Sequence, residues 1–147
     1  MDTVTNLKTQ EWINALRSGQ YTQTRGCLHN STDGGFCCLG VAEFVIWNTT
    51  FVPNPDSDNQ DHLGLWDEGD QEYKQILAYD HQLELGLGAD DNDHLADLND
   101  HHSFTFNQIA DVLAEADRRQ VSIQQAAWDL YPDMLPNTWE PTLEDLI

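Results

Sequence analysis

The sequence predicts a helix-dominated α+β fold, a single domain with a small antiparallel sheet or hairpin. Three observations favour this class. Several segments repeat apolar residues at helical spacing and carry capping residues at their ends. A strong turn signal, Ser31-Thr-Asp-Gly-Gly, separates two segments that favour extended structure. A chain of 147 residues is also long enough for one hydrophobic core, so one acidic domain is expected over residues 1–147.

The N-terminal third is expected to form a helix, a hairpin and a second helix. Apolar residues recur at helical spacing over residues 6–18. Residues 20–30 favour an extended conformation, and the turn would return the chain into a short strand at 36–38. An apolar run with a single charge, Glu43, follows at 39–47. We favour a buried helix for this run, although its periodicity also allows a strand.

The middle of the chain carries weaker structural signals. Residues 49–70 are predicted to form a long loop, because Pro, Asn and Asp are frequent and apolar anchors are few. Residues 73–87 are predicted to form a short pair of strands. A helix is predicted over 90–99, because its first residues are carboxylates, which stabilise the positive end of a helix dipole.

The clearest predicted element is a helix that begins after Thr105. Thr105 and Gln108 have capping-box spacing, and Phe104 and Ile109 have the spacing of a hydrophobic staple. The helix is predicted to end near 118–119, where two arginines suit the C-terminal end of the dipole.

A short helix is predicted over 122–130, where Ser122 and Gln125 repeat the capping pattern. Three prolines then predict an irregular tail over 131–147, with Trp139 packing back onto the body.

The charge of the chain is strongly negative and unevenly distributed. There are 26 acidic and six basic residues, and residues 54–100 contain fourteen of the acids and a single lysine. Phosphate binding depends on Lys and Arg, so we expect neither direct nucleic-acid binding nor binding to an anionic membrane. Two interpretations stay open: an adaptation for solubility or high salt, and a surface that attracts a basic protein partner.

The three cysteines, Cys27, Cys37 and Cys38, match no zinc-binding spacing and no disulfide framework. Cys37 or Cys38 would be a nucleophile if a histidine activated it. The surrounding run is apolar, however, so we favour buried core cysteines. Residues 1–5 lack the features of a signal peptide, and a reducing cytoplasm is therefore expected.

His94, Asp97 and His101 have i, i+3 and i+7 spacing and would share one face of a helix. Such a face is a weak candidate for a metal site. The helix is predicted to end near Asn99, so we favour a solvated polar face, and we expect no metal or other cofactor.

Arg17 and Arg25 are two of the six basic side chains. With Trp12 or Tyr21 stacking nearby, they would bind a phosphate or nucleotide ligand. The alternative, which we favour, is that both arginines pair with surface carboxylates.

Four short motifs, in this order, resemble those of a family of small, uncharacterised bacteriophage proteins. They are Trp12-Ile-Asn-Ala-Leu-Arg-Ser-Gly, Phe36-Cys-Cys-Leu-Gly-Val, Leu95-Ala-Asp-Leu-Asn-Asp and Phe104-Thr-Phe-Asn-Gln-Ile-Ala-Asp. The resemblance covers about half of the chain. It implies a phage gene expressed in the cytoplasm of a bacterial host, and it brings no activity that attaches to a residue.

No catalytic motif is found, so an enzyme is not expected. The leading hypothesis is a phage accessory protein, an inhibitor or counter-defence factor whose acidic surface mimics nucleic acid and binds a basic, nucleic-acid-binding host protein. The alternatives are a small-molecule binder that sequesters a nucleotide signal and a minor virion structural protein. The residues expected to bind the partner are Asp56, Asp58, Asp61, Asp67, Glu68, Asp70, Asp90, Asp91 and Asp93.

Overall fold

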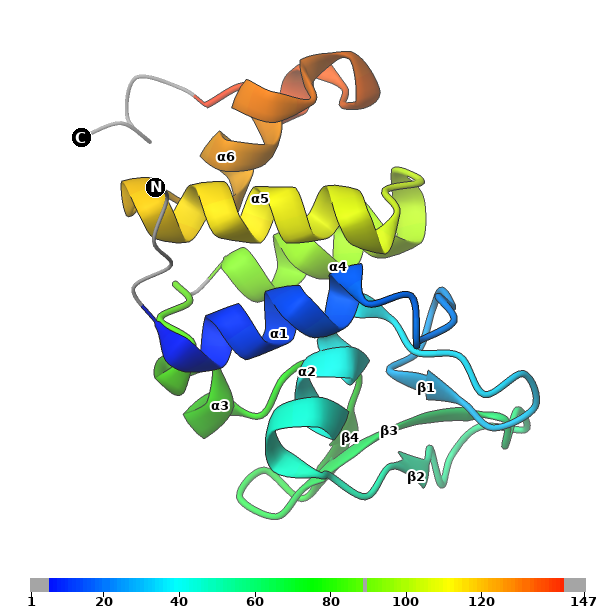
Figure 1. The fold of residues 1–147 in the computed structure, drawn as a ribbon. Helices are drawn as coiled ribbons and strands as arrows, with labels where there is room; N and C mark the ends of the chain where they lie inside the picture. Colours follow the sequence, from blue (N-terminus) through cyan, green and yellow to red (C-terminus); the bar gives the residue numbers. More distant parts are fainter. Residues whose placement is uncertain (1–5, 89, 142–147) are drawn as a thin grey trace.

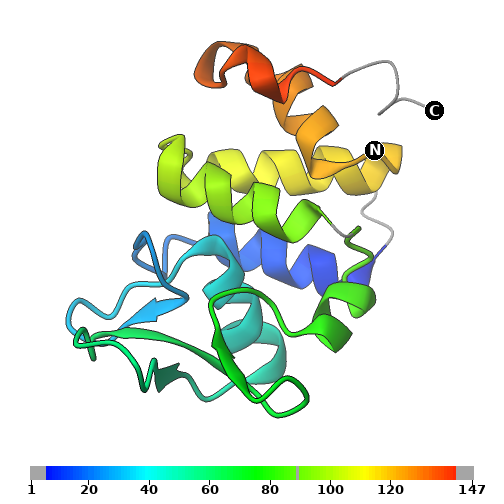
Figure 2. The same ribbon diagram turned by 180° about the vertical axis from the view of Figure 1, so that it is seen from behind.

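The computed structural model describes residues 6–88 and 90–141 and confirms a helix-dominated α+β fold (Figure 1). Within these residues the chain forms six α-helices and a four-stranded antiparallel sheet. The helices stack on one another, and the sheet lies at one end of the stack, as the view from behind also shows (Figure 2). The sheet is therefore the end face of the molecule.

Helix α1 (Leu7–Arg17) confirms the predicted first helix. The side chain of Asn6 accepts a hydrogen bond from the backbone N–H of Thr9 at 3.0 Å, which satisfies one of the free donors at the helix start. The buried face of α1 places Trp12 and Leu16 in the hydrophobic core.

Helix α2 (Cys38–Trp47) confirms the helix favoured for the apolar run. Its first six residues are all buried, so no polar stripe marks a helical period in the sequence. Gly40 allows close contact with the preceding chain, because a Cβ at this position would lie 1.9 Å from the carbonyl oxygen of Leu28. Packing therefore requires glycine at residue 40.

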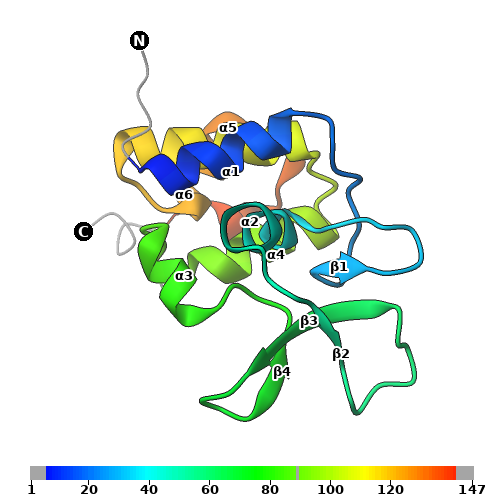
Figure 3. The same ribbon diagram turned by 60° about the horizontal axis from the view of Figure 1, so that its bottom comes forward.

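Four strands form the sheet: β1 (His29–Asn30), β2 (Val52–Pro53), β3 (His62–Asp67) and β4 (Glu72–Lys74). The first half of β3 pairs with β1 and β2, and its second half pairs with β4. The ring of Tyr73 lies against Gly64, where an added Cβ would come 2.8 Å from the ring carbon Cζ. β3 is thus the central strand, and Figure 3 shows it across the end face.

Three of the structural predictions for residues 36–87 are wrong. Residues 49–70 are not one long loop, because they contain β2 and β3. Residues 73–87 hold the end of β4 and helix α3 (Tyr79–Glu84) in place of a strand pair. The strand predicted at 36–38 is reduced to isolated bridges from Phe36, because Cys37 already caps α2.

The C-terminal helices are α4 (Asp91–His101), α5 (Phe106–Arg119) and α6 (Ile123–Leu130). α4 ends two residues after the predicted end. The predicted capping box of α5 is confirmed in both directions: the N–H of Thr105 donates to the side chain of Gln108 at 2.9 Å, and the N–H of Gln108 donates to the Thr105 hydroxyl at 3.2 Å. The three helices pack on one another and on α1 and α2.

The tail after α6 forms two 3₁₀ turns, Pro132–Met134 and Asn137–Trp139. Trp139 is buried, as predicted, and lies against His94 and His102. The last part of the predicted tail, 142–147, lies outside the described residues. None of the described helices has the length and apolar character needed to cross a bilayer.

Candidate functional site

The nine acids expected to bind a partner fall into three groups in the structure. The loop carboxylates, between β2 and β3, are Asp56, Asp58 and Asp61. The hairpin carboxylates, at the turn between β3 and β4, are Asp67, Glu68 and Asp70. The third group, at the start of α4, is Asp90, Asp91 and Asp93. The predicted acidic cluster is therefore not one continuous patch.

The backbone of the β2–β3 loop is held by neutral side chains. Asn54 Oδ1 accepts from the N–H of Asp56 at 3.0 Å, and Asn59 Oδ1 accepts from the N–H of Asp61 at 3.1 Å. Such Asx turns fix the loop without using the carboxylates. The three loop carboxylates are exposed, and no cationic side chain of residues 6–88 or 90–141 lies within ion-pair distance of them. Their full charge faces solvent.

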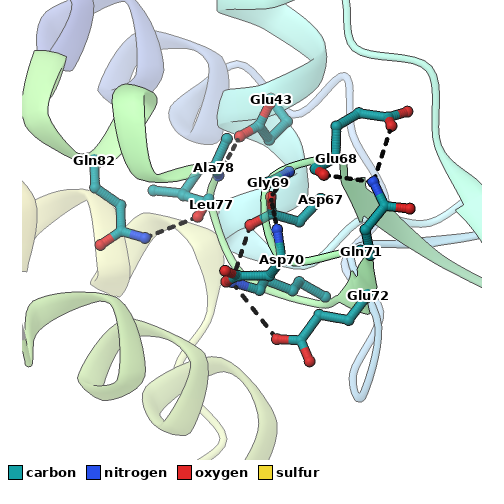
Figure 4. Close-up of polar contacts among 11 residues, drawn as sticks. Glu43, Asp67, Glu68, Gly69, Asp70, Gln71, Glu72, Leu77, Ala78 and Gln82 are labelled. Atoms are coloured by element: carbon teal, nitrogen blue, oxygen red, sulfur yellow. Dashed lines mark hydrogen bonds and ion pairs between the residues drawn. The ribbon is translucent and has the colours of Figure 1, made fainter.

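Two of the hairpin carboxylates, Asp67 and Asp70, pair with Lys74. The third, Glu68, lies against Gln71 (Figure 4). The Lys74 ammonium lies 3.0 Å from Asp67 Oδ2, 2.6 Å from Asp70 Oδ2 and 3.7 Å from Glu72 Oε1. Asp67 Oδ1 also accepts from the backbone N–H of Gly69 at 2.9 Å. The hydrogen bond from Lys74 lowers the pKa of Asp67, and the bonds to Asp70 and Asp67 raise the pKa of Lys74. One ammonium thus faces three carboxylates.

The loop and hairpin carboxylates lie at opposite ends of β3 (Figure 3). A six-residue strand is roughly 20 Å long at about 3.3 Å per residue. This separation exceeds twice the Debye length of about 8 Å at physiological ionic strength. A partner therefore meets two local acidic groups on the end face, each of which acts over short range.

A cleft of about 580 Å³ lies between the β3–β4 hairpin and residues 76–82. Its apolar lining comes from Leu65, Ile76, Leu77 and Ala78. Trp66 and Tyr79 also line it, with 40% and 70% of their surface exposed. Asp67, Glu68 and Asp80 supply carboxylates at the same cleft. It is the cavity at which the acidic hairpin and exposed aromatic rings meet.

The wall of this cleft opposite the hairpin is held in place by Glu43, which is fully buried. Its carboxylate accepts from the backbone N–H of Ala78 at 3.1 Å and from the Thr49 hydroxyl at 2.7 Å. It lies 2.8 Å from Nδ1 of His81, whose ring stacks on Trp47 with centroids 3.7 Å apart. A lone charge in an apolar run is a sequence signal for a buried carboxylate with hydrogen-bond partners, and this role of Glu43 is not among the predictions made from the sequence.

Asp91 has a structural role. Its Oδ1 accepts from the N–H of Ile123 at 3.0 Å, and its Oδ2 accepts from the N–H of Gly88 at 2.7 Å. Both oxygens are used inside the fold, whereas Asp90 and Asp93 are exposed. α4 packs against α2, α5 and α6, so this third group belongs to the helical layer.

The residues considered for a nucleotide ligand are dispersed. Trp12 is fully buried and donates from Nε1 to the carbonyl oxygen of Cys38 at 2.8 Å. Arg17 pairs with Asp111 at 2.7 Å, and Tyr21 packs edge-on against Phe36. Arg25 is exposed and has no partner among residues 6–88 and 90–141, so the pairing favoured for it is not seen. These four side chains do not line a common cavity in the described part of the chain.

His94, Asp97 and His101 all line one shallow depression on α4, because the helix extends through residue 101. Asp97 Oδ2 is already hydrogen-bonded to Nε2 of His102 at 3.0 Å, and the ring of His94 lies against Trp139. No group of three or more His, Cys, Asp or Glu side chains in the described residues is arranged to hold a metal ion.

The three cysteines are free and buried, which confirms the core interpretation. Burial raises the pKa of Cys37 to about 12 and raises the pKa of Cys38 well above that of an ordinary thiol. A thiol of this kind is protonated at neutral pH, so the geometry disfavours Cys37 or Cys38 as a nucleophile.

The fold and this surface define a strongly acidic α+β protein with one group of carboxylates at each end of its central strand. A family model described as a domain of unknown function (DUF8296) matches residues 5–48, less than a third of the chain. The matched segment contains α1 and α2 and ends before β2. No curated protein and no solved structure matches the chain.

Proposed function

We propose that this protein binds a basic protein partner through the loop and hairpin carboxylates. The observation that supports this best is the β2–β3 loop, which exposes Asp56, Asp58 and Asp61 without a cationic partner while neutral side chains hold its backbone. A loop built in this way keeps its charge available to another molecule.

Three other cations of the chain pair with acids outside the loop and hairpin carboxylates. Lys8 pairs with Glu84, Arg17 with Asp111, and Arg119 with Asp129. These cations therefore do not compensate the loop and hairpin carboxylates. The end face keeps a net negative charge that attracts Lys and Arg side chains and speeds association.

The resemblance to small bacteriophage proteins provides the biological setting of the proposal. In this setting the protein is a phage accessory factor in the host cytoplasm, and its partner is a host protein whose basic surface normally binds nucleic acid. Carboxylates then occupy positions that phosphates would otherwise fill, and the result is inhibition of a host function such as defence.

A pull-down from host bacterial lysate, eluted in steps of increasing salt, tests the proposal. We expect one or a few basic, nucleic-acid-binding proteins to elute at moderate salt, because exposed charge pairs are screened. Added duplex DNA should compete with this capture. Release of a nucleotide instead, or capture that resists high salt and ignores DNA, would contradict the proposal.

A further inference from the structure

We propose that the cleft between the β3–β4 hairpin and residues 76–82 binds an arginine side chain of the partner. The inference rests on the proposed function and deepens it, because it assigns one residue type of the partner to one place on the end face. Three observations support it: the cleft itself, the exposed rings of Trp66 and Tyr79 that line it, and its negative charge.

The aromatic rings of the cleft are left open by the fold. Trp66 has no ring contact and donates no hydrogen bond from Nε1 within the described residues, and Tyr79 lies on the first turn of α3. The other tryptophans with described contacts are used internally: Trp12 bonds to the backbone, Trp47 stacks on His81 and Trp139 is buried. An open indole face beside carboxylates is a surface on which a cation stacks favourably.

The charge of the cleft stays negative despite Lys74. The ammonium is already engaged by Asp67 and Asp70. Glu68 and Asp80 line the same cleft and have no cationic partner among residues 6–88 and 90–141. Two uncompensated carboxylates therefore remain for an incoming cation.

Arginine fits this combination better than lysine does. Its planar guanidinium stacks on an aromatic face and donates from a fork of N–H groups to carboxylates, whereas the lysine ammonium is compact and more strongly hydrated. The apolar floor formed by Leu65 and Ile76 suits the three methylene groups of the arginine stem.

The test uses short capped peptides that place one arginine, lysine or citrulline between glycines. Binding is followed by NMR, from the indole N–H of Trp66 and the backbone amides of Gly69 and Ala78. We expect saturable shifts of these signals with the arginine peptide, at least about threefold weaker binding of the lysine peptide, and no saturation with citrulline, which keeps the shape and lacks the charge. Equal binding of citrulline, or shifts elsewhere only, would overturn the inference.

Two variants test whether the arginine peptide binds at the cleft or elsewhere on the surface. Trp66→Leu should weaken the arginine peptide roughly three- to fivefold, a typical size for an exposed cation–π contact. Phe44→Leu is the matched control, because Phe44 is 41% exposed and does not line the cleft, and it should leave the affinity unchanged. An equal loss in both variants would overturn the assignment.

Failure of this inference is distinguishable from failure of the proposed function. A variant with Asp56→Asn, Asp58→Asn and Asp61→Asn should bind the arginine peptide within about twofold of the wild type, because these residues lie at the other end of β3. If the cleft binds no arginine peptide while this variant loses the captured partner, the cleft assignment falls and the proposed function stands. If the cleft binds arginine but no basic protein is captured, the proposed function alone falls.

Discussion

Glu43 is a charged side chain that the fold buries completely and satisfies completely. Glu43 lies on α2, and its oxygens accept from the Thr49 hydroxyl in the following loop and from the Ala78 N–H and the His81 ring at the start of α3 and within it. One carboxylate therefore joins three segments and fixes the position of residues 78–81. Because Ala78, Tyr79 and Asp80 line the cleft, Glu43 acts on the site only through their placement.

Replacing Glu43 with alanine should destabilise the protein by roughly 3 kcal/mol, because it leaves the His81 ring and two other partly buried donors without their acceptor. Urea denaturation measures this loss. Glu84→Gln is the control, since its pair with Lys8 is solvent-exposed and is worth less than about 1 kcal/mol. A loss for Glu43→Ala as small as that of the control would show that Glu43 is not a structural link.

Asp67 provides a pH-dependent prediction. Its pKa is lowered by the hydrogen bond from Lys74, whereas an unfolded aspartate has a pKa of about 3.9. Since the folded value is the lower one, the ionised carboxylate contributes stability above about pH 4, and this contribution is lost as the pH falls through the folded pKa. NMR titration of the side-chain carboxyl carbons should place the pKa of Asp67 below that of an unfolded aspartate, and Lys74→Met should raise the pKa of Asp67. An unchanged value in that variant would contradict the assignment.

At the scale of the element, the capping box of α5 is the interaction whose loss is most simply measured. Thr105→Ala removes the acceptor for the N–H of Gln108 and should cost about 1 kcal/mol of unfolding free energy. Asn107→Ala changes an exposed residue of the same turn and should be neutral or slightly stabilising, because alanine favours helix. Equal effects of the two substitutions on thermal or urea unfolding would contradict the role of the cap.

The elements that could be predicted from the sequence are those that carry their own signals. α5 has a capping box, a staple and one apolar face, and its bounds follow from these features. α2 is harder to predict, because its first six residues are all buried and show no helical period. β3 could not be predicted in this way, because part of its pairing is with β1, which precedes α2 and lies outside the window of a local pattern.

The candidate site could be predicted only in part, for a similar reason. Composition located the acids in the middle of the chain, but only the fold shows that three of them lie at each end of β3 and that Asp91 is used internally. The cleft brings together residues 65–69 and 76–82 across a hairpin, and no spacing rule joins an exposed Trp66 to Tyr79. The exposure of Arg25 likewise depends on its neighbours in space.

At the scale of the whole molecule, the question is whether function depends on the position of particular carboxylates or on the net charge of the protein. A solubility adaptation would depend on net charge wherever it lies, whereas a binding surface depends on where the carboxylates are placed. The two ends of β3 are separated by more than the screening length, so removal of one group should not be compensated by charge elsewhere. Position and total charge can therefore be varied independently.

The most direct test of this account compares two variants that lose the same three charges, in quantitative pull-downs from host lysate. One carries Asp56→Asn, Asp58→Asn and Asp61→Asn in the β2–β3 loop. The other carries Glu11→Gln, Asp133→Asn and Glu140→Gln, which are exposed residues on α1 and the C-terminal turns.

We predict that the loop variant captures about tenfold less of the basic protein than the wild type does. Three solvent-facing charge contacts at about 0.5 kcal/mol each amount to roughly 1.5 kcal/mol, and about 1.4 kcal/mol is a factor of ten in affinity. The matched variant should capture as much as the wild type. Equal capture by both variants, or an equal loss in both, would contradict a binding surface at the ends of the sheet.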